Sequence, residues 1–189
     1  MTPAARLDEA FAAAPRAGFL PAGQRRFARL DRPLPIGRGQ TNSQPATVRA
    51  MLRLLDVRPG HRVLDVGSGS GWTTALLSFL VGPTGEVVGV EIVPELVVLG
   101  RRNLARAGVA ARVEQAREGV LGLPEQAPYD RVLVSAEATR LPTALVEQLV
   151  VGGVLVVPVA GWMHEVRRRD GDPDDVRRGP YSFVPLVGG

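Results

Sequence analysis

A carboxylate followed by three closely spaced glycines is the pattern in this sequence that most directly suggests chemistry, and it occupies residues 64–71, LDVGSGSG. Gly67 and Gly69 let a ligand approach the backbone closely, and Gly71 lets the turn pack against the sheet. Asp65, two residues before the first glycine, supplies a negative charge for a cationic group of a ligand. The turn is therefore expected to bind a small molecule.

Two classes of cofactor compete for a turn of this kind. The dinucleotide fingerprint needs the spacing G-x-G-x-x-G, and its last glycine would fall here on Trp72 or Thr74. The observed spacing is G-x-G-x-G, which resembles the turn of the class I S-adenosylmethionine (SAM) methyltransferases. SAM carries no phosphate and needs no tight anion cradle, but it has an ammonium group that Asp65 can hold directly or through water.

Two further acids follow predicted strands and complete the expected cofactor site. Glu91 lies 20 residues after Gly71, where a carboxylate can accept both ribose hydroxyls, although NAD enzymes use the same position. Glu118 follows the next strand, where it can accept a hydrogen bond from an adenine amino group; the alternative is a solvated loop acid. The predicted cofactor-binding residues are Asp65, Gly67, Ser68, Gly69, Gly71, Glu91, Ile92, Glu118 and Gly119.

The elements that position these residues alternate between strands and helices. Such alternation predicts βαβ units, here a Rossmann-like, doubly wound α/β fold with a mostly parallel seven-stranded sheet. Apolar runs fit strands that are covered on both faces. A C-terminal antiparallel hairpin is expected from segments near 163–169 and 180–187. The remaining strands are expected at 62–66, 86–91, about 111–116, 130–135 and 154–159, and the helices at 72–81, about 94–107 and 142–150, with Gly152-Gly153 as a chain turn.

The region before the first strand is expected to be an N-terminal helical extension. Residues 4–30 show helical spacing that is broken at Pro15, and residues 31–44 contain prolines and glycines typical of an ordered loop. A helix follows, with Ser43 as its candidate N-cap. The predicted division is therefore 1–44 for the extension with a substrate and cofactor loop, and 45–189 for a SAM-binding domain.

Four segments together resemble the protein-L-isoaspartate O-methyltransferases, and the resemblance extends over nearly the whole chain. The loop before the SAM turn is its specific part, because general methyltransferases lack this loop. The segments are PLPIGRGQTNSQP at 33–45, LGLPEQAPYDRVLVSAEA at 121–138, LVEQLVVGGVLVVPV at 145–159 and the closing FVPLVGG, with AFAAAPRAGFLP at 10–21 in addition.

This resemblance implies a methyl transfer from SAM to the free carboxylate of an isoaspartyl residue in a damaged protein or peptide, with S-adenosyl-L-homocysteine as product. The family's loop reads roughly G-x-G-Q-T-I-S-A-P-H. It implies Ser43 as the catalytic residue and, as substrate-binding residues, Gly39, Gln40, Thr41 and Asn42. The chain departs from the loop at Asn42, Gln44 and Ala46, where the family has Ile, Ala and His, and its R-E-G at Glu118 replaces the family's G-D-G.

The chemistry of such a transfer makes modest demands on side chains. A carboxylate has an unperturbed pKa near 4 and is already ionised at pH 7, so no general base is required. The protein must align oxygen, methyl carbon and sulfur, and it must exclude water. We expect Ser43 and backbone amides of residues 39–43 to hold the carboxylate; the alternative is that Ser43 serves only as a helix N-cap.

Composition narrows the remaining possibilities. The chain of 189 residues has no cysteine and two histidines, His61 and His164, so thiolate and histidine-rich metal sites are excluded. Lysine is absent as well, and the net charge of +4 is too modest to favour nucleic acid. No apolar run is long enough to span a bilayer. We expect a cytoplasmic monomer that binds neither nucleic acid nor membrane, with both histidines at the surface and Trp72 packed at the start of its helix.

Alternatives to this interpretation concern the acceptor and the activity. A carboxyl methyltransferase with another acceptor, such as aspartate in a ribosomal peptide natural product, would suit the altered loop. A SAM-binding protein without catalysis is a second alternative, and an NAD-dependent enzyme is a more distant one.

Overall fold

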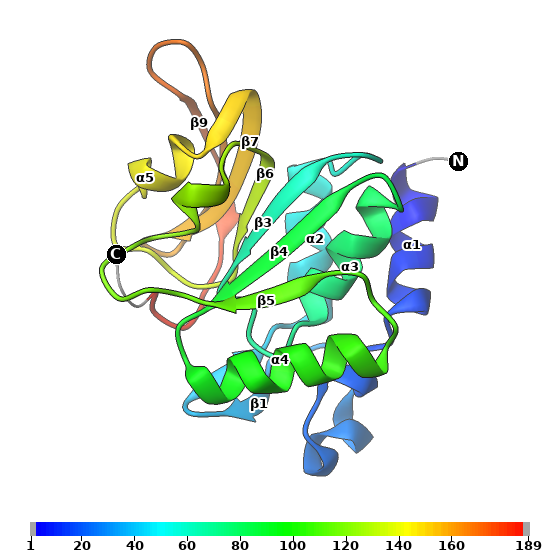
Figure 1. Ribbon diagram of the computed structural model, residues 1–189. Coiled ribbons are helices and arrows are strands. Elements are labelled where there is room, and N and C mark those ends of the chain that lie inside the picture. Colours follow the sequence, from blue (N-terminus) through cyan, green and yellow to red (C-terminus); the bar gives the residue numbers. More distant parts are fainter. Residues whose placement is uncertain (1–2, 187–189) are drawn as a thin grey trace.

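The computed structural model describes residues 3–186, and its centre is a seven-stranded sheet with the order β5-β4-β3-β6-β7-β8-β9 (Figure 1). The strands from β5 to β7 are parallel, and β8 and β9 continue the sheet antiparallel. This confirms the predicted fold class. The strands are β3 (Arg62–Val66), β4 (Glu86–Glu91), β5 (Arg112–Gln115), β6 (Tyr129–Val134), β7 (Leu149–Val159), β8 (Trp162–Arg167) and β9 (Asp174–Pro180).

Helices cover the two faces of this sheet unequally. Neighbouring residues of a strand point to opposite faces, so Val63 and Leu64 belong to two different apolar cores. The first core lies beneath three long helices and an outer N-terminal one, and the second lies beneath short elements. The helices are α1 (Pro3–Ala13), α2 (Pro45–Leu55), α3 (Trp72–Val81), α4 (Pro94–Arg106) and α5 (Thr143–Val146), with 3-10 turns η1 (Arg16–Phe19), η2 (Ala22–Phe27) and η3 (Pro124–Gln126).

The segment around Gly152 and Gly153 differs from the prediction. The predicted helix 142–150 is limited to α5, and the two glycines form an irregularity inside β7 instead of a chain turn. Gly152 has a φ of +83°, and a Cβ on Gly153 would lie 2.9 Å from the carbonyl oxygen of Val150. The glycines therefore let one long strand bend where shorter elements were expected.

The C-terminal hairpin also begins earlier than predicted. Its second strand is β9, not 180–187, and residues 187–189, including the end of the FVPLVGG motif, lie outside the described residues. The interpretation of His164 as a surface residue is wrong: its side chain is buried, with Nδ1 2.7 Å from the Asp175 carboxylate. Asp175 on the neighbouring strand β9, two residues from the register partner Arg177, gives the buried imidazole a polar partner. His61 is half-buried, and its Nδ1 accepts a hydrogen bond from the Arg58 N–H.

The predicted loop 31–44 contains a small antiparallel hairpin of β1 (Leu34–Gly37) and β2 (Gln40–Asn42). Ser43 is not the N-cap of α2; that position belongs to Gln44, whose side chain makes no capping hydrogen bond. The carboxylate of Asp31 takes over this role, because it accepts hydrogen bonds from the Ala46 N–H at 2.9 Å and from Gln44 Nε2 at 3.0 Å.

The N-terminal extension packs directly on the glycine turn through Trp72. The indole Nε1 of this buried residue donates to the carbonyl oxygen of Ala14 at 2.9 Å. Its ring packs edge to face with Phe11, and the two ring centroids lie 5.6 Å apart. The expected packing of Trp72 at the start of its helix is confirmed. In residues 3–186, no helix is long and apolar enough to cross a membrane.

Candidate active site

The glycine turn joins β3 to α3 and is fixed by its backbone. Gly67, Gly69 and Gly71 all have positive φ angles, of +75°, +53° and +84°. The N–H groups of Gly67 and Ser68 donate to the carbonyl oxygen of Val90, so the turn is tied to β4. A Cβ on Gly71 would lie 3.2 Å from the Gly100 carbonyl oxygen. Gly71 therefore allows contact with α4, not with the sheet as expected.

Gly89 in β4 is a second requirement of this turn, one that the sequence interpretation missed. A Cβ at this position would lie 2.8 Å from Ser68 Cβ and 3.0 Å from Thr74 Oγ1. Because Cβ atoms do not approach other atoms so closely, only glycine leaves room for the turn to rest on the strand. A glycine inside an otherwise valine-rich strand is the signal that indicates such an approach.

Asp65 lies fully buried beneath the turn. Its Oδ2 accepts hydrogen bonds from the hydroxyls of Thr73 and Thr74, both at 2.7 Å. Burial raises the pKa of Asp65 to about 6, and the two hydroxyls oppose this increase. Within residues 3–186, Asp65 Oδ1 and Ser68 Oγ are the buried side-chain atoms that lack a hydrogen-bond partner. This turn therefore has acceptor capacity for a ligand that carries hydrogen-bond donors, as the ammonium group of SAM does.

Glu91 at the end of β4 is held in place by two backbone groups. Its Oε2 accepts from the Gly69 N–H and its Oε1 from the Val93 N–H, both at 2.9 Å. Glu91 is only 6% exposed, yet it lines a cavity at the end of its strand. Each oxygen can accept a further hydrogen bond, because a carboxylate offers about four acceptor positions. The carboxylate is thus oriented to receive two adjacent hydroxyls.

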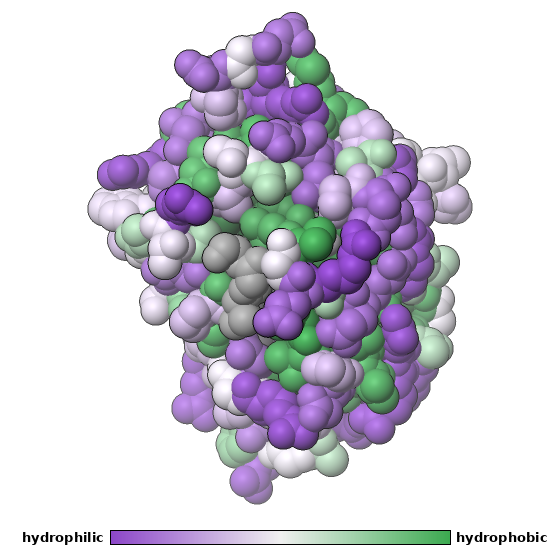
Figure 2. Space-filling view, turned by 60° about the vertical axis from the view of Figure 1, so that its left-hand side comes forward, coloured by the Kyte–Doolittle hydropathy of each residue, from purple (hydrophilic) through white to green (hydrophobic). Residues whose placement is uncertain are grey.

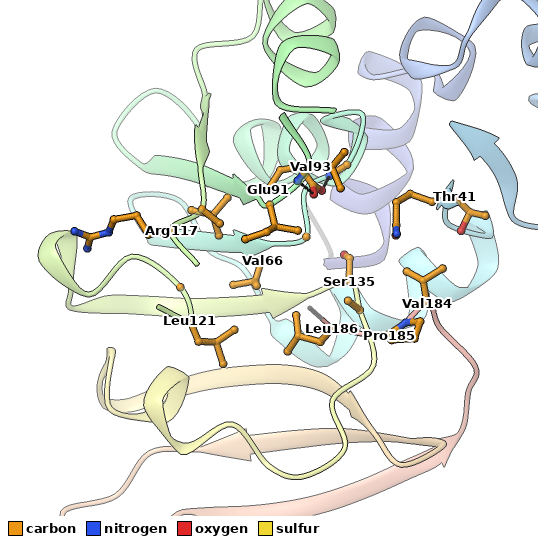
Figure 3. Close-up of a pocket in the computed structure, with 18 of the residues that line it drawn as sticks. Thr41, Val66, Glu91, Val93, Arg117, Leu121, Ser135, Val184, Pro185 and Leu186 are labelled. Carbon is orange, nitrogen blue, oxygen red and sulfur yellow. Dashed lines mark hydrogen bonds between the residues drawn. The ribbon is translucent and has the colours of Figure 1, made fainter. Parts of the chain in front are cut away.

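The main cavity lies at the carboxyl ends of β3, β4 and β6, where the strand order reverses. This is the point at which open α/β sheets bind ligands. Its lining combines apolar side chains with a few polar groups, as is typical of a small-molecule site. In Figure 3, Arg117 and Leu121 stand on one side of the cavity, with Thr41 and Val184 on the other. Its lining includes Ile36, Gln40, Thr41, Val66, Gly67, Gly69, Glu91, Ile92, Ser135 and Leu186.

Four of the nine predicted cofactor residues, Gly67, Gly69, Glu91 and Ile92, line the main cavity, and five do not. Asp65 and Gly71 are buried in or beneath the turn, and Ser68 lines a small recess beside it. Glu118 is exposed in the loop after β5, and Gly119 lines a neighbouring hollow beside Leu121. Ala116 and Arg117 occupy the wall where the adenine contact was expected. The hydrogen bond from Glu118 to adenine remains a prediction.

A second hollow, here called the acceptor cavity, lies between the β1–β2 hairpin and the C-terminal segment. Thr41, Ser135 and Val184 line both this cavity and the main cavity, so the two hollows are neighbours. Figure 3 shows these three residues in the wall of the main cavity. Ser43 lines the acceptor cavity and also a small recess beside the glycine turn. The full lining in the described chain is Pro33, Thr41, Ser43, Gln44, Thr47, Ser135, Ser182, Phe183 and Val184.

The hairpin residues predicted to bind substrate fall into different settings. Thr41 lines the acceptor cavity and Gln40 the main cavity, whereas Gly39 lines none of the hollows described here. Asn42 is buried, and both ends of its amide are used in hydrogen bonds to Arg16 and Ser70. Its substrate-binding role therefore has no support from this arrangement.

Residues 182–186 form a wall of the site that the sequence interpretation missed. Hydrogen bonds to Glu137 hold this segment in place. The backbone N–H of Glu137 donates to Val184, and the Leu186 N–H donates back, both at 2.8 Å. The carboxylate of Glu137 accepts from the Phe183 N–H at 3.2 Å and from the Gly161 N–H at 2.9 Å. An acid just beyond the carboxyl end of β6 was the available signal.

The surface of the molecule agrees with a hollowed, apolar site. In Figure 2, apolar residues gather in a hollow at the middle of the visible face, and hydrophilic residues surround them. Such a hollow with a few converging polar groups is typical of a small-molecule site.

Comparison with known proteins decides the family. A model of the protein-L-isoaspartate(D-aspartate) O-methyltransferase family matches residues 2–189. The chain belongs to this family. It is similar to the protein-L-isoaspartate O-methyltransferases of Methanopyrus kandleri (45% identity, 97% of this chain and 84% of the relative) and Aeropyrum pernix (46% identity, 97% and 73%).

A solved protein-L-isoaspartate O-methyltransferase is similar in structure as well. It has a TM-score of 0.87 and 26% identity, and the match covers 97% of this chain and 61% of that one. Membership in the family accounts for the joint presence of a SAM-type glycine turn and a hairpin before it.

Proposed function

We propose that this protein transfers a methyl group from SAM to the free carboxylate of isoaspartyl residues in damaged proteins or peptides. One observation carries the proposal beyond family membership: Thr41, Ser135 and Val184 line both the main cavity and the acceptor cavity, and Ser43 lines the acceptor cavity. A methyl donor in the main cavity and a carboxylate in the acceptor cavity would therefore lie in neighbouring hollows. S-adenosyl-L-homocysteine would be the other product.

The residues beside the glycine turn fit SAM. The oriented carboxylate of Glu91 would accept the ribose hydroxyls, and Asp65, whose Oδ1 lacks a donor, would hold the ammonium directly or through water. When bound, SAM supplies a methyl group on a positively charged sulfur. The apolar walls, among them Val66 and Val90, exclude water from this place.

The acceptor cavity would hold the substrate carboxylate by neutral donors. No charged side chain lines it among the described residues, whereas hydroxyl groups come from five of them: Thr41, Ser43, Thr47, Ser135 and Ser182. A carboxylate is ionised at pH 7 and attacks without a base, so the hydroxyls need only bind and orient it. Orientation of this kind contributes roughly 7–11 kcal/mol to lowering a barrier.

The departure from the family's loop at Ala46 is compatible with this arrangement. Ala46 is exposed and does not line the acceptor cavity, and its N–H is already bonded to Asp31. The family's histidine at this position thus has no counterpart in the cavity, and we infer that the hydroxyls and loop amides suffice for binding.

The test is transfer of a labelled methyl group from SAM to matched peptides, one with isoaspartate and one with aspartate. We expect a base-labile label on the isoaspartyl peptide alone. Label on both peptides, or on neither in a sample that binds S-adenosyl-L-homocysteine, would contradict the proposal and favour another acceptor or a binding role.

A further inference from the structure

Arg16 is a buried cation that the proposed chemistry does not use. Its side chain is 6% exposed, and burial lowers its pKa to about 10, an effect that the charge of Asp31 partly opposes. The guanidinium still carries its charge at neutral pH. Among the described residues, its hydrogen-bond partners are all uncharged: one side-chain amide and four backbone carbonyls.

These partners all belong to the segment that builds the acceptor cavity. Arg16 Nη2 donates to the carbonyl oxygens of Asn42 at 3.0 Å and Ser43 at 2.9 Å, which lie on either side of the Ser43 α-carbon. It also donates to Arg32 at 2.8 Å, and Nη1 donates to Leu30 at 3.0 Å. One planar fork therefore fixes the backbone before and after the hairpin.

A side-chain path continues from Arg16 to the glycine turn. Arg16 Nε donates to Asn42 Oδ1 at 2.7 Å, and Asn42 Nδ2 donates to Ser70 Oγ at 3.1 Å. The guanidinium also lies 5.4 Å from the centre of the Trp72 ring, at the start of α3. All three polar residues are buried, so each lost hydrogen bond would leave an unpaired group in the interior.

We propose that Arg16 is a positioning residue, which holds Ser43 in place for methyl transfer and, through Asn42 and Ser70, sets the hairpin against the cofactor turn. The inference rests on the function proposed above. Its physical basis is that transfer in line needs the acceptor oxygen at one place relative to the turn, and a small displacement is costly to the rate.

Arg16→Lys tests the proposal, because lysine keeps the charge but loses the planar fork of five donors. We expect kcat with an isoaspartyl peptide to fall about tenfold, while the Kd of S-adenosyl-L-homocysteine changes less than about threefold. In a Ser43→Ala background the same substitution should cost less than about threefold, since Arg16 acts through Ser43. Arg29→Ala, an exposed arginine of the same extension, is the matched control and should leave all values unchanged.

If kcat of the double variant falls by the product of the two single-variant losses, the positioning role is overturned. A lower melting temperature of Arg16→Lys with unchanged kcat would overturn it as well. Asn42→Leu is the second variant, in case Arg16→Lys does not fold. It keeps a side chain of similar size and removes both hydrogen bonds, and we expect the same pattern. Unchanged kcat in a folded Asn42→Leu protein would contradict the path to Ser70.

Amide hydrogen exchange separates this inference from the proposed function. In Arg16→Lys the amides of residues 40–43 should exchange at least about tenfold faster than in the unsubstituted protein, with S-adenosyl-L-homocysteine bound. This readout needs no acceptor. Unchanged exchange would overturn the positioning role, whereas an unsubstituted protein without activity on isoaspartyl peptides would contradict only the function.

Discussion

The glycine turn and the β1–β2 hairpin lie side by side, but different interactions fix their conformations. The turn depends on missing side chains, because a Cβ on Gly89 would overlap Ser68 and a Cβ on Gly71 would crowd Gly100. The hairpin depends on donated hydrogen bonds, and at its end three of them come from the single guanidinium of Arg16. The turn should therefore be sensitive to added atoms and the hairpin to lost donors. Three substitutions and two pH dependences test the two regions.

The largest effect is expected from Gly89→Ala. The added methyl group would overlap Ser68 and Thr74, and such overpacking costs about 1–3 kcal/mol of unfolding free energy. Because the overlap displaces the turn, we also expect the affinity for S-adenosyl-L-homocysteine to fall about 100-fold. Urea unfolding and calorimetry measure the two quantities. Gly23→Ala is the control, since its Cβ meets nothing within 4 Å; equal effects of both would refute the steric account.

A smaller loss of cofactor affinity is expected from Glu91→Gln. The amide would present an NH2 group to the backbone N–H of Gly69 or Val93, so one buried donor loses its acceptor. That donor is unpaired with or without ligand, so it lowers stability, whereas the ribose hydroxyls lose a charged acceptor. A hydrogen bond to a charged group contributes about 1.5–3 kcal/mol, which corresponds to roughly 30-fold in the Kd of S-adenosyl-L-homocysteine. Titration calorimetry measures it. Glu95→Gln removes an exposed acid paired with Arg38 and should leave the Kd unchanged; the account fails if the two variants behave alike.

Ser43→Ala tests the difference between the two regions at the end of the hairpin. It removes one donor to the substrate carboxylate, and we expect kcat to fall about tenfold with little change in the Kd of S-adenosyl-L-homocysteine. Steady-state kinetics with an isoaspartyl peptide gives the first value and calorimetry the second. Ser78→Ala on α3 is the control. A large loss of cofactor binding in Ser43→Ala would show that the two regions are not separable.

The smallest effect is a dependence of cofactor binding on pH. Burial raises the pKa of Asp65 to about 6, and a ligand ammonium favours its ionised form. Affinity for S-adenosyl-L-homocysteine should therefore weaken about fourfold between pH 8 and pH 5.5, and Asp65→Asn should remove this dependence. A profile that stays the same in Asp65→Asn would assign the proton to another group.

The ligand-free protein should show the opposite sign in its stability. From about pH 4 to about pH 6 the folded state holds the Asp65 proton more tightly than the unfolded chain does. This group therefore lowers the unfolding free energy as the pH rises through that interval. Chemical denaturation of the protein and of Asp65→Asn at both pH values measures the contribution.

The sequence predicts the cofactor half of the site better than the acceptor half. Strands 62–66 and 86–91 are confirmed to the residue, because apolar runs between turns leave a local pattern. The hairpin strands have only four and three residues, too few for a periodic pattern. The Arg16–Asn42 contact joins residues 26 positions apart, which no local pattern reveals. Monomeric state, cytoplasmic location and the individual site roles stay predictions.

Apart from Ser135, the walls of the acceptor cavity come from opposite ends of the described chain, at residues 33–47 and 182–184. Loops of such length close late during folding, because their entropy is lost before their contacts form. A chain whose sheet is formed but whose ends are not docked would have the glycine turn and no place for an acceptor. Competence to modify damaged proteins thus becomes a property of the completely folded chain alone, which restrains partly folded copies from methylating the carboxylates around them.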